Sequence, residues 1–76
     1  MKIDDKVMVT ENVNGYYLLR CGVQITVAVP GMRRGVVREI PEATRGGESL
    51  FIGIGFPDQY KTIFVPKSSL KPVKEG

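Results

Sequence analysis

The stretch Thr62–Val73, TIFVPKSSLKPV, decides how this chain folds. A strand that reaches Pro66 loses its next ladder donor, because proline has no N–H, so strand pairing ends there. The two serines that follow can hydrogen-bond their own backbone in a single 3₁₀ turn. Such a turn places Leu70 on the core, and Pro72 prevents the chain from continuing as a helix. The stretch therefore predicts a strand, a 3₁₀ turn and a last extended segment.

Short alternating segments precede this stretch, at the spacing of roughly 8–12 residues that is typical of all-β domains. Asn14-Gly15 is the strongest reversal signal, so we expect a turn over Glu11–Gly15. Pro30-Gly31 predicts a type II turn with the glycine at the position that needs a positive φ. The expected strands are Lys6–Thr10, Val23–Val29, Gly35–Ile40, Leu50–Phe56 and Lys61–Val65, while Tyr16–Arg20 is either a short extended piece or a single helical turn.

These signals predict an all-β fold, a small and partly open barrel of five or six short strands with one 3₁₀ turn near the C-terminus. A chain of 76 residues allows one domain, 1–76, whose ends at about 1–5 and 74–76 we expect to be flexible. The polar loop Pro41–Glu48 is expected to be a mobile hairpin tip. Gly53 and Gly55 share one strand face and indicate bending or close backbone approach. The expected core consists of Val7, Val9, Ile25, Val27, Val36, Leu50, Ile52, Ile54, Ile63, Val65 and Leu70.

Composition limits the chemistry that the chain can perform alone. With no histidine and one cysteine, we expect neither a metal site nor another bound cofactor. Cys21 is expected to be a semi-buried, inert thiol, since no histidine can act as its base. No run approaches the ~20 apolar residues that span a bilayer, and the N-terminus does not resemble a signal peptide. We therefore expect a cytoplasmic protein that does not enter the membrane.

Catalytic residues are not expected either. The carboxylates are scattered through predicted turns and ends, where solvated surface acids are the simpler interpretation. Gly53-Ile54-Gly55 lies within a predicted strand rather than before a helix, so it does not fit a phosphate-binding loop. These carboxylates are Asp4, Asp5, Glu11, Glu39, Glu42, Glu48, Asp58 and Glu75.

A basic turn, Gly31–Val37, is one candidate binding site. Its adjacent Arg33 and Arg34 could bind phosphates or acidic side chains, and Arg38 and Arg45 could extend the patch. The simpler interpretation is a solvated hairpin with flanking charge. The net charge of +3 permits an acidic partner but is lower than the charge typical of nucleic-acid-binding domains.

Aromatic residues beside predicted turns are a second candidate site. They could line a peptide groove or an aromatic cage, although packing within the fold is the simpler interpretation. The chain has no tryptophan and lacks an acidic loop of the kind used in proline-motif recognition. The aromatic residues in question are Tyr16, Tyr17, Phe56 and Tyr60.

Three separated segments of the chain resemble the small variable subunit of ferredoxin–thioredoxin reductase. They are Lys6–Val13, Gly31–Val37, and Lys61–Pro66 followed by Leu70. The resemblance implies an SH3-like barrel without catalytic residues that packs on a separate chain carrying an Fe–S cluster. The chain departs from that subunit in the Arg33-Arg34 pair, among other places, and no functional residue is carried over.

The size of the chain and its Thr62–Pro66 strand also resemble the small plasmid-encoded dihydrofolate reductases, SH3-like chains that build one active site in a tetramer. The Val-Gln-Ile-Tyr run of those enzymes is missing here. The leading hypothesis is thus a non-catalytic protein-interaction module, an accessory subunit of a redox enzyme. The alternatives are a nucleic-acid-binding domain similar to KOW-type modules and a symmetric oligomeric reductase.

Overall fold

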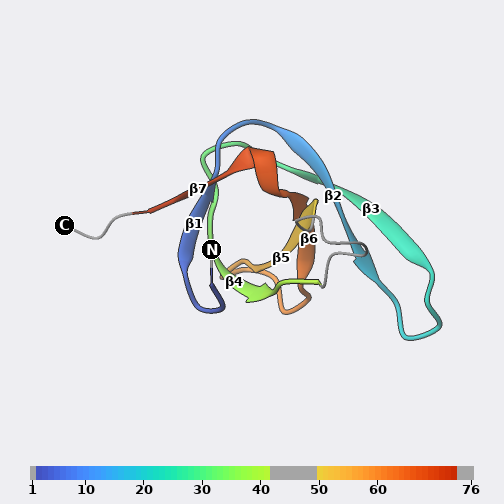
Figure 1. The fold of residues 1–76 in the computed structure, drawn as a ribbon. Coiled ribbons are helices and arrows are strands. Elements are labelled where there is room, and N and C mark those ends of the chain that lie inside the picture. The colour runs from blue at the N-terminus through green and yellow to red at the C-terminus, as the bar shows by residue number, and fades with distance from the viewer. Residues whose placement is uncertain (1, 42–49, 74–76) are drawn as a thin grey trace.

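The computed structural model describes residues 2–41 and 50–73, which form one antiparallel sheet of seven strands (Figure 1). The all-β prediction and the predicted 3₁₀ turn are confirmed. The strand number exceeds the expected five or six, because the segment between the first two expected strands contributes a full strand, β2, and the C-terminal segment contributes another. The elements are β1 (Lys6–Val9), β2 (Val13–Leu18), β3 (Gln24–Val29), β4 (Arg34–Glu39), β5 (Phe51–Gly55), β6 (Ile63–Pro66), η1 (Lys67–Ser69) and β7 (Leu70–Pro72).

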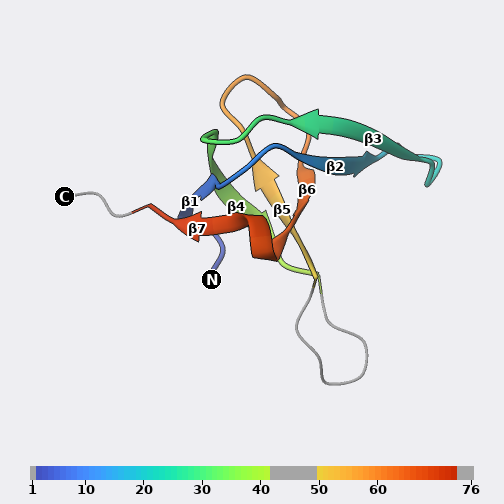
Figure 2. The same cartoon turned by 90° about the horizontal axis from the view of Figure 1, so that it is seen from above.

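The strands lie in the order β3-β2-β6-β5-β4-β1-β7 and curve around a shared interior (Figure 1). The first and last strands therefore lie side by side at one side of the sheet, where β1 pairs with both β4 and β7. The β2–β3 hairpin lies at the other side and extends beyond the remaining strands (Figures 1 and 2).

The closing stretch folds as the sequence predicts. Strand β6 ends at Pro66, η1 follows, and the Leu70 N–H donates to the Lys67 carbonyl to close the turn. Leu70 lies opposite Val9 of β1 and is 9% exposed, so its side chain belongs to the core. The buried Ser69 accepts the Thr10 N–H at 2.8 Å through its carbonyl, which fixes the turn against the end of β1.

The core lies on the concave side of the sheet and differs in part from the expected one. The assignment of Leu50 to the core is wrong, because Leu50 precedes the first paired residue of β5 and is 79% exposed. The assignment of Val36 to the core is also wrong, because Gly35 and Val37 are the residues of β4 that face inward. Ile25 and Val27 are only half-buried. The buried hydrophobic residues are Val7, Val9, Val29, Val37, Ile52, Ile54, Phe56, Ile63, Phe64, Val65 and Leu70.

The turn expected at Asn14-Gly15 is wrong, because both residues lie inside β2, the first strand of the β2–β3 hairpin. A Cβ on Gly15 would lie 2.7 Å from the Phe64 carbonyl oxygen, so this glycine allows β6 to approach. The segment from Tyr16 is extended rather than helical. The chain reverses one turn later: the Gly22 N–H donates to the Leu19 carbonyl and Gly22 has φ +89°. Glycine adopts that left-handed conformation without steric cost.

The turn between β3 and β4 also differs from its prediction. The positive φ falls on Met32, at +66°, and not on Gly31. Gly31 instead donates its N–H to the Asn12 side-chain oxygen at 2.7 Å, and a Cβ there would lie 2.9 Å from Glu11 Cα. Close packing against the β1–β2 connection, rather than turn type, explains this glycine.

Residues 2–5 lead into β1 and contact β4. The Asp4 N–H donates to the Val37 carbonyl at 2.8 Å, and the Val37 N–H donates to the Asp5 carbonyl at 2.9 Å. The Lys2 N–H donates to the Asp5 carboxylate at 2.8 Å. The expectation of a mobile Pro41–Glu48 loop concerns residues that, except for Pro41, lie outside the described ranges, as do residues 74–76.

Candidate functional site

The convex side of the sheet, opposite the core, carries two groups of side chains that the strand register brings together. The first is an aromatic surface made of Tyr16 on β2, Phe51 on β5 and Phe64 on β6. The Tyr16 and Phe64 rings are stacked, with centroids 5.1 Å apart and 17° between their planes. The Tyr16 and Phe51 rings are tilted, with centroids 5.3 Å apart.

Strand pairing explains why these rings meet. Phe64 lies opposite Tyr16 on one side and opposite Gly53 on the other. Because Gly53 has no side chain, the Phe64 ring can lie over it: a Cβ at Gly53 would be 3.2 Å from Phe64 Cε1. Phe64 is therefore buried, at 8% exposure, although it lies on the outer face, while Tyr16 and Phe51 are half-buried. The atoms close to Gly53 belong to side chains, those of Thr62, Glu39 and Phe64, so this glycine makes room for neighbouring side chains rather than for the close backbone approach that the sequence suggested.

The second group is a basic face on β1, β4 and β7. Met8 of β1 lies opposite Arg34 on one side and Lys71 on the other, so these three side chains share the outer face. Lys6 is two residues before Met8 and lies on the same face, opposite Val36. The exposed cations of the basic face are Lys6, Arg34, Arg38 and Lys71.

Arg38 belongs to this face because of a second glycine. Gly55 lies opposite Val36, and a Cβ on Gly55 would coincide with the Arg38 side chain. The Arg38 side chain thus lies across β5, in the space that the side chain of any residue other than glycine at position 55 would fill. The register of β4 against β5 shifts between Val37 and Glu39, just where Arg38 is placed.

Arg33 is separated from its neighbour Arg34 and does not join the basic face. Its guanidinium forms an ion pair with Asp58 and lies 4.9 Å from the centroid of the Phe56 ring. Phe56 itself is a core residue, 4% exposed, and not a wall of a binding site. Arg33 thus joins the turn before β4 to the turn after β5.

Tyr17 and Tyr60, two further predicted site residues, come close to one another through Lys61. The Lys61 ammonium lies 5.0 Å from the Tyr17 ring centroid and 5.5 Å from that of Tyr60. Tyr17 packs against the core, whereas Tyr60 is 94% exposed. The arrangement is a cation–π contact within the chain, on the side of β2 away from Tyr16.

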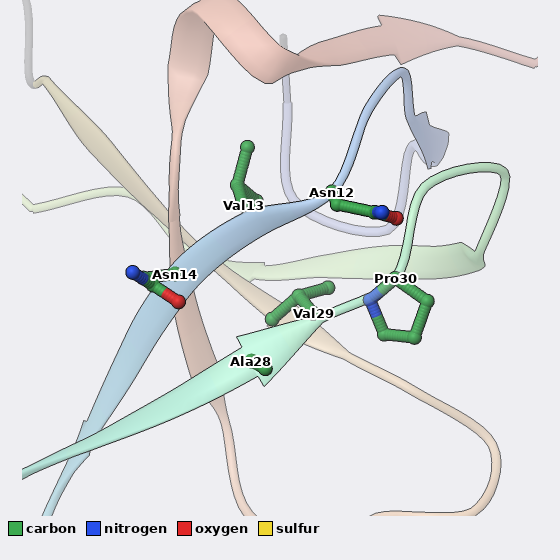
Figure 3. A pocket seen from close by; sticks show the side chains of 6 residues that line it. All are labelled: Asn12, Val13, Asn14, Ala28, Val29 and Pro30. Carbon is green, nitrogen blue, oxygen red and sulfur yellow. The ribbon is translucent and has the colours of Figure 1, made fainter.

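A hollow of about 470 Å³ lies at the base of the hairpin (Figure 3). Its polar side chains are Asn12 and Asn14, which cannot act as acid or base near neutral pH. Asn12 already accepts the Gly31 N–H. The other lining residues are Val13, Ala28, Val29 and Pro30.

Cys21 is exposed in the hairpin turn, so the expectation of a semi-buried thiol is wrong. Among residues 2–41 and 50–73, no cluster of histidine, cysteine and carboxylate side chains could hold a metal ion. The same part of the chain has no helix long and apolar enough to cross a membrane. Arg45 lies outside the described residues.

Comparisons of this chain with protein families, with curated proteins and with solved structures find no match. The candidate site is therefore defined by geometry alone. Tyr16, Arg34 and Arg38 were singled out from the sequence and lie on the outer face.

Sequence reasoning missed the other members of both groups. Phe51 and Phe64 each alternate with residues that are buried in the core. Gly53, two residues after Phe51, is a local signal of a packed outer face on β5, but β6 has no glycine beside Phe64. Lys6 and Lys71 stand at opposite ends of the chain. Only the pairing of β1 with β7 brings them together.

Proposed function

We propose that this chain is a non-catalytic protein-interaction module with SH3-like connectivity, and that it binds another protein through the aromatic surface. The observation that carries the proposal is the group of packed rings of Tyr16, Phe64 and Phe51 on the outer face, where two rings remain partly accessible. Aromatic side chains are enriched, and charged ones depleted, at the centres of protein interfaces.

The connectivity supports the SH3-like part of the proposal. A first strand is followed by a long hairpin, then by the three neighbouring strands β4, β5 and β6. A 3₁₀ turn then returns the chain to the first strand, where β7 pairs with β1. This order agrees with what the resemblance to the variable subunit of ferredoxin–thioredoxin reductase implies, and it makes an Fe–S redox enzyme the first class of partner to test.

The test is affinity capture of the tagged chain from a nuclease-treated lysate of its source, with mass spectrometry of the proteins retained. Tyr16→Ala removes one ring from the aromatic surface, and Phe51→Ala removes another. We expect a stoichiometric protein partner to be retained by the native chain and lost with either variant. Circular dichroism and thermal unfolding establish that both variants remain folded.

Tyr60→Ala is the matched control, because Tyr60 is a tyrosine that is almost fully exposed and lies outside the aromatic surface. Retention of the partner by this variant is expected. A partner that survives both outer-face substitutions while the variants stay folded would overturn the proposal. A partner that depends on Tyr60 would move the interface to the opposite side of β2.

Nucleic-acid binding is a second candidate function, favoured by the basic face. Four cations on three adjacent strands match the electrostatic requirement for phosphate binding. This face differs from the expected turn, because Arg33 is engaged by Asp58 and Lys71 takes part instead.

Fluorescence anisotropy with a labelled single-stranded RNA and a DNA duplex, over a series of salt concentrations, tests this second function. Loss of one phosphate contact lowers the slope of log affinity against log salt by about one. Arg34→Ala and Lys71→Ala should each do so, whereas Arg33→Ala should not. Absence of binding at low salt would remove this candidate without affecting the first.

A further inference from the structure

The two edges of the sheet are protected to very different degrees. The β7 edge has three residues and carries Lys71 and Pro72, which discourage pairing with another strand. The β3 edge has six residues, QITVAV, without a charge or a proline. It pairs with β2 in six consecutive steps without a bulge, so the edge is long and regular.

Hairpin geometry shows which backbone groups this edge presents. The Leu19 N–H donates to the Val23 carbonyl at 2.9 Å, so these two residues form a hydrogen-bonded pair. Hydrogen-bonded pairs alternate along an antiparallel ladder, so Ile25, Val27 and Val29 bond to β2. The N–H and C=O groups of the residues between them, Gln24, Thr26 and Ala28, therefore point away from β2. Among residues 2–41 and 50–73, no strand lies on that side.

The segment around Thr26 is nearly palindromic in chemistry. Val23 and Val29 are equidistant from Thr26, as are Ile25 and Val27, and all four are aliphatic. Two antiparallel copies related by a twofold axis at Thr26 would place Ile25 opposite Val27 on the inner face. They would place Gln24 opposite Ala28 on the outer face. No charge would meet a like charge, although each chain carries +3.

We propose that β3 is a self-association edge, and that a second copy of this chain pairs with it antiparallel about Thr26 to form one continuous sheet. The aliphatic side chains of β3 and its flank that stay partly exposed in a single copy support a second copy as the partner of this edge. Val23 is 52% exposed, and Ile25 and Val27 are only half-buried. In the proposed register each of them gains an aliphatic neighbour from the second copy. This proposal is independent of the proposed function.

The test is the mass of the full chain in solution, measured by sedimentation equilibrium over a wide range of concentrations. An edge contact of one strand is a small interface, so we expect a concentration-dependent monomer–dimer equilibrium. A reductant is present throughout, because the exposed Cys21 could otherwise link two copies covalently.

Two substitutions at the twofold axis address the edge without disturbing the β2 ladder. Thr26→Pro removes an N–H that points away from β2, and Thr26→Lys places like charges opposite one another in the dimer. Each should weaken dimerisation about tenfold or more. Thr26→Pro does so by removing an N–H that would bond to the second copy, whereas Thr26→Lys keeps this N–H and acts through repulsion between two opposed ammonium groups. Thr26→Val retains the N–H and the branched side chain, and it should dimerise like the native chain.

Circular dichroism and thermal unfolding of the same samples report whether the variants keep the fold. A native chain that stays monomeric at every concentration would overturn the proposal and leave the edge to a different partner. A dimer that folded Thr26→Pro and Thr26→Lys variants leave unchanged would also overturn it, since the contact would then lie elsewhere.

Discussion

The β2–β3 hairpin and the rest of the sheet are stabilised in different ways. Strands β1, β4, β5 and β6 each have a neighbour on both sides, and their inward residues, such as Val9, Val37 and Ile54, are fully buried. The hairpin is joined to the sheet by a single paired position, Tyr16 opposite Phe64. Its far end carries Leu18 and Val23, which are about half exposed.

This difference indicates a division of roles. Burial on the concave side supplies the free energy of folding, because each fully buried aliphatic side chain contributes roughly 1.5–3 kcal/mol. The hairpin contributes less to the core and leaves more of its surface and backbone accessible. Both proposed interfaces use it: Tyr16 belongs to the aromatic surface and Thr26 to the self-association edge.

Truncation of Leu70 should have the largest effect on stability. Leu70→Ala removes a core side chain that fills the interior beneath η1, so we expect a loss of about 2–5 kcal/mol in the free energy of unfolding. Urea denaturation followed by circular dichroism measures it. Leu50→Ala is the matched control, because Leu50 is 79% exposed and its loss should cost under about 0.5 kcal/mol. Similar losses for the two leucines would contradict the assignment of Leu70 to the core.

A methyl group at Gly15 should affect the joint between the two regions. In Gly15→Ala the new Cβ would lie 2.7 Å from the Phe64 carbonyl oxygen and 3.0 Å from Ile63 Cγ2, so β2 and β6 must separate. We expect a loss of about 1–3 kcal/mol from this overpacking. Amide hydrogen exchange should show greater loss of protection in β2 and β3 than in β1 and β4. Uniform loss across the sheet would show that the hairpin and the remaining strands unfold as one unit.

The sequence predicted the C-terminal part of the fold because its signals are local. Pro66 ends β6 by lacking a donor, and Leu70 follows within one turn, so neighbours along the chain determine the result. Gly15 was misassigned for the opposite reason. It follows an asparagine, as in a tight turn, but its role is to admit a carbonyl of β6, a partner that is distant in sequence.

The candidate site was predictable to a similar extent. Arg34 and Arg38 are separated by four positions on one strand, so their shared face follows from alternation. Arg33 was wrongly grouped with them, because alternation directs it to the other side, where Asp58 and Phe56 bind it. The contribution of Lys71 depends on sheet order, which no local pattern reveals.

A smaller effect is expected at the hairpin turn. Gly22 has φ +89°, and nothing lies within 4 Å of a Cβ placed there, so Gly22→Ala introduces backbone strain without a clash. The strain should cost about 1–2 kcal/mol. Gly22→Asn should recover part of this loss, since asparagine tolerates the left-handed region. Thermal unfolding of the two variants measures the difference, and equal destabilisation would show that strain at this position is not the cause.

The smallest effect is expected where Arg33 and Asp58 connect two turns of the main sheet. Asp58→Asn preserves shape and removes the charge. The Arg33 and Asp58 side chains are 27% and 63% exposed, so solvent screens the pair and we expect a loss of about 0–1 kcal/mol. The loss should shrink in high salt, as for any exposed ion pair.

Urea denaturation at low and high salt measures this difference, and Arg33→Met separates its causes. Methionine keeps an unbranched side chain against Phe56 but cannot form the ion pair or the cation–π contact. If Arg33→Met costs more than Asp58→Asn and the excess persists in salt, contact with the buried Phe56 ring contributes to stability in addition to the ion pair. Equal and salt-sensitive losses would assign the contribution to the ion pair. Either result keeps Arg33 within the fold, because its guanidinium is engaged on the side of β4 away from the exposed cations.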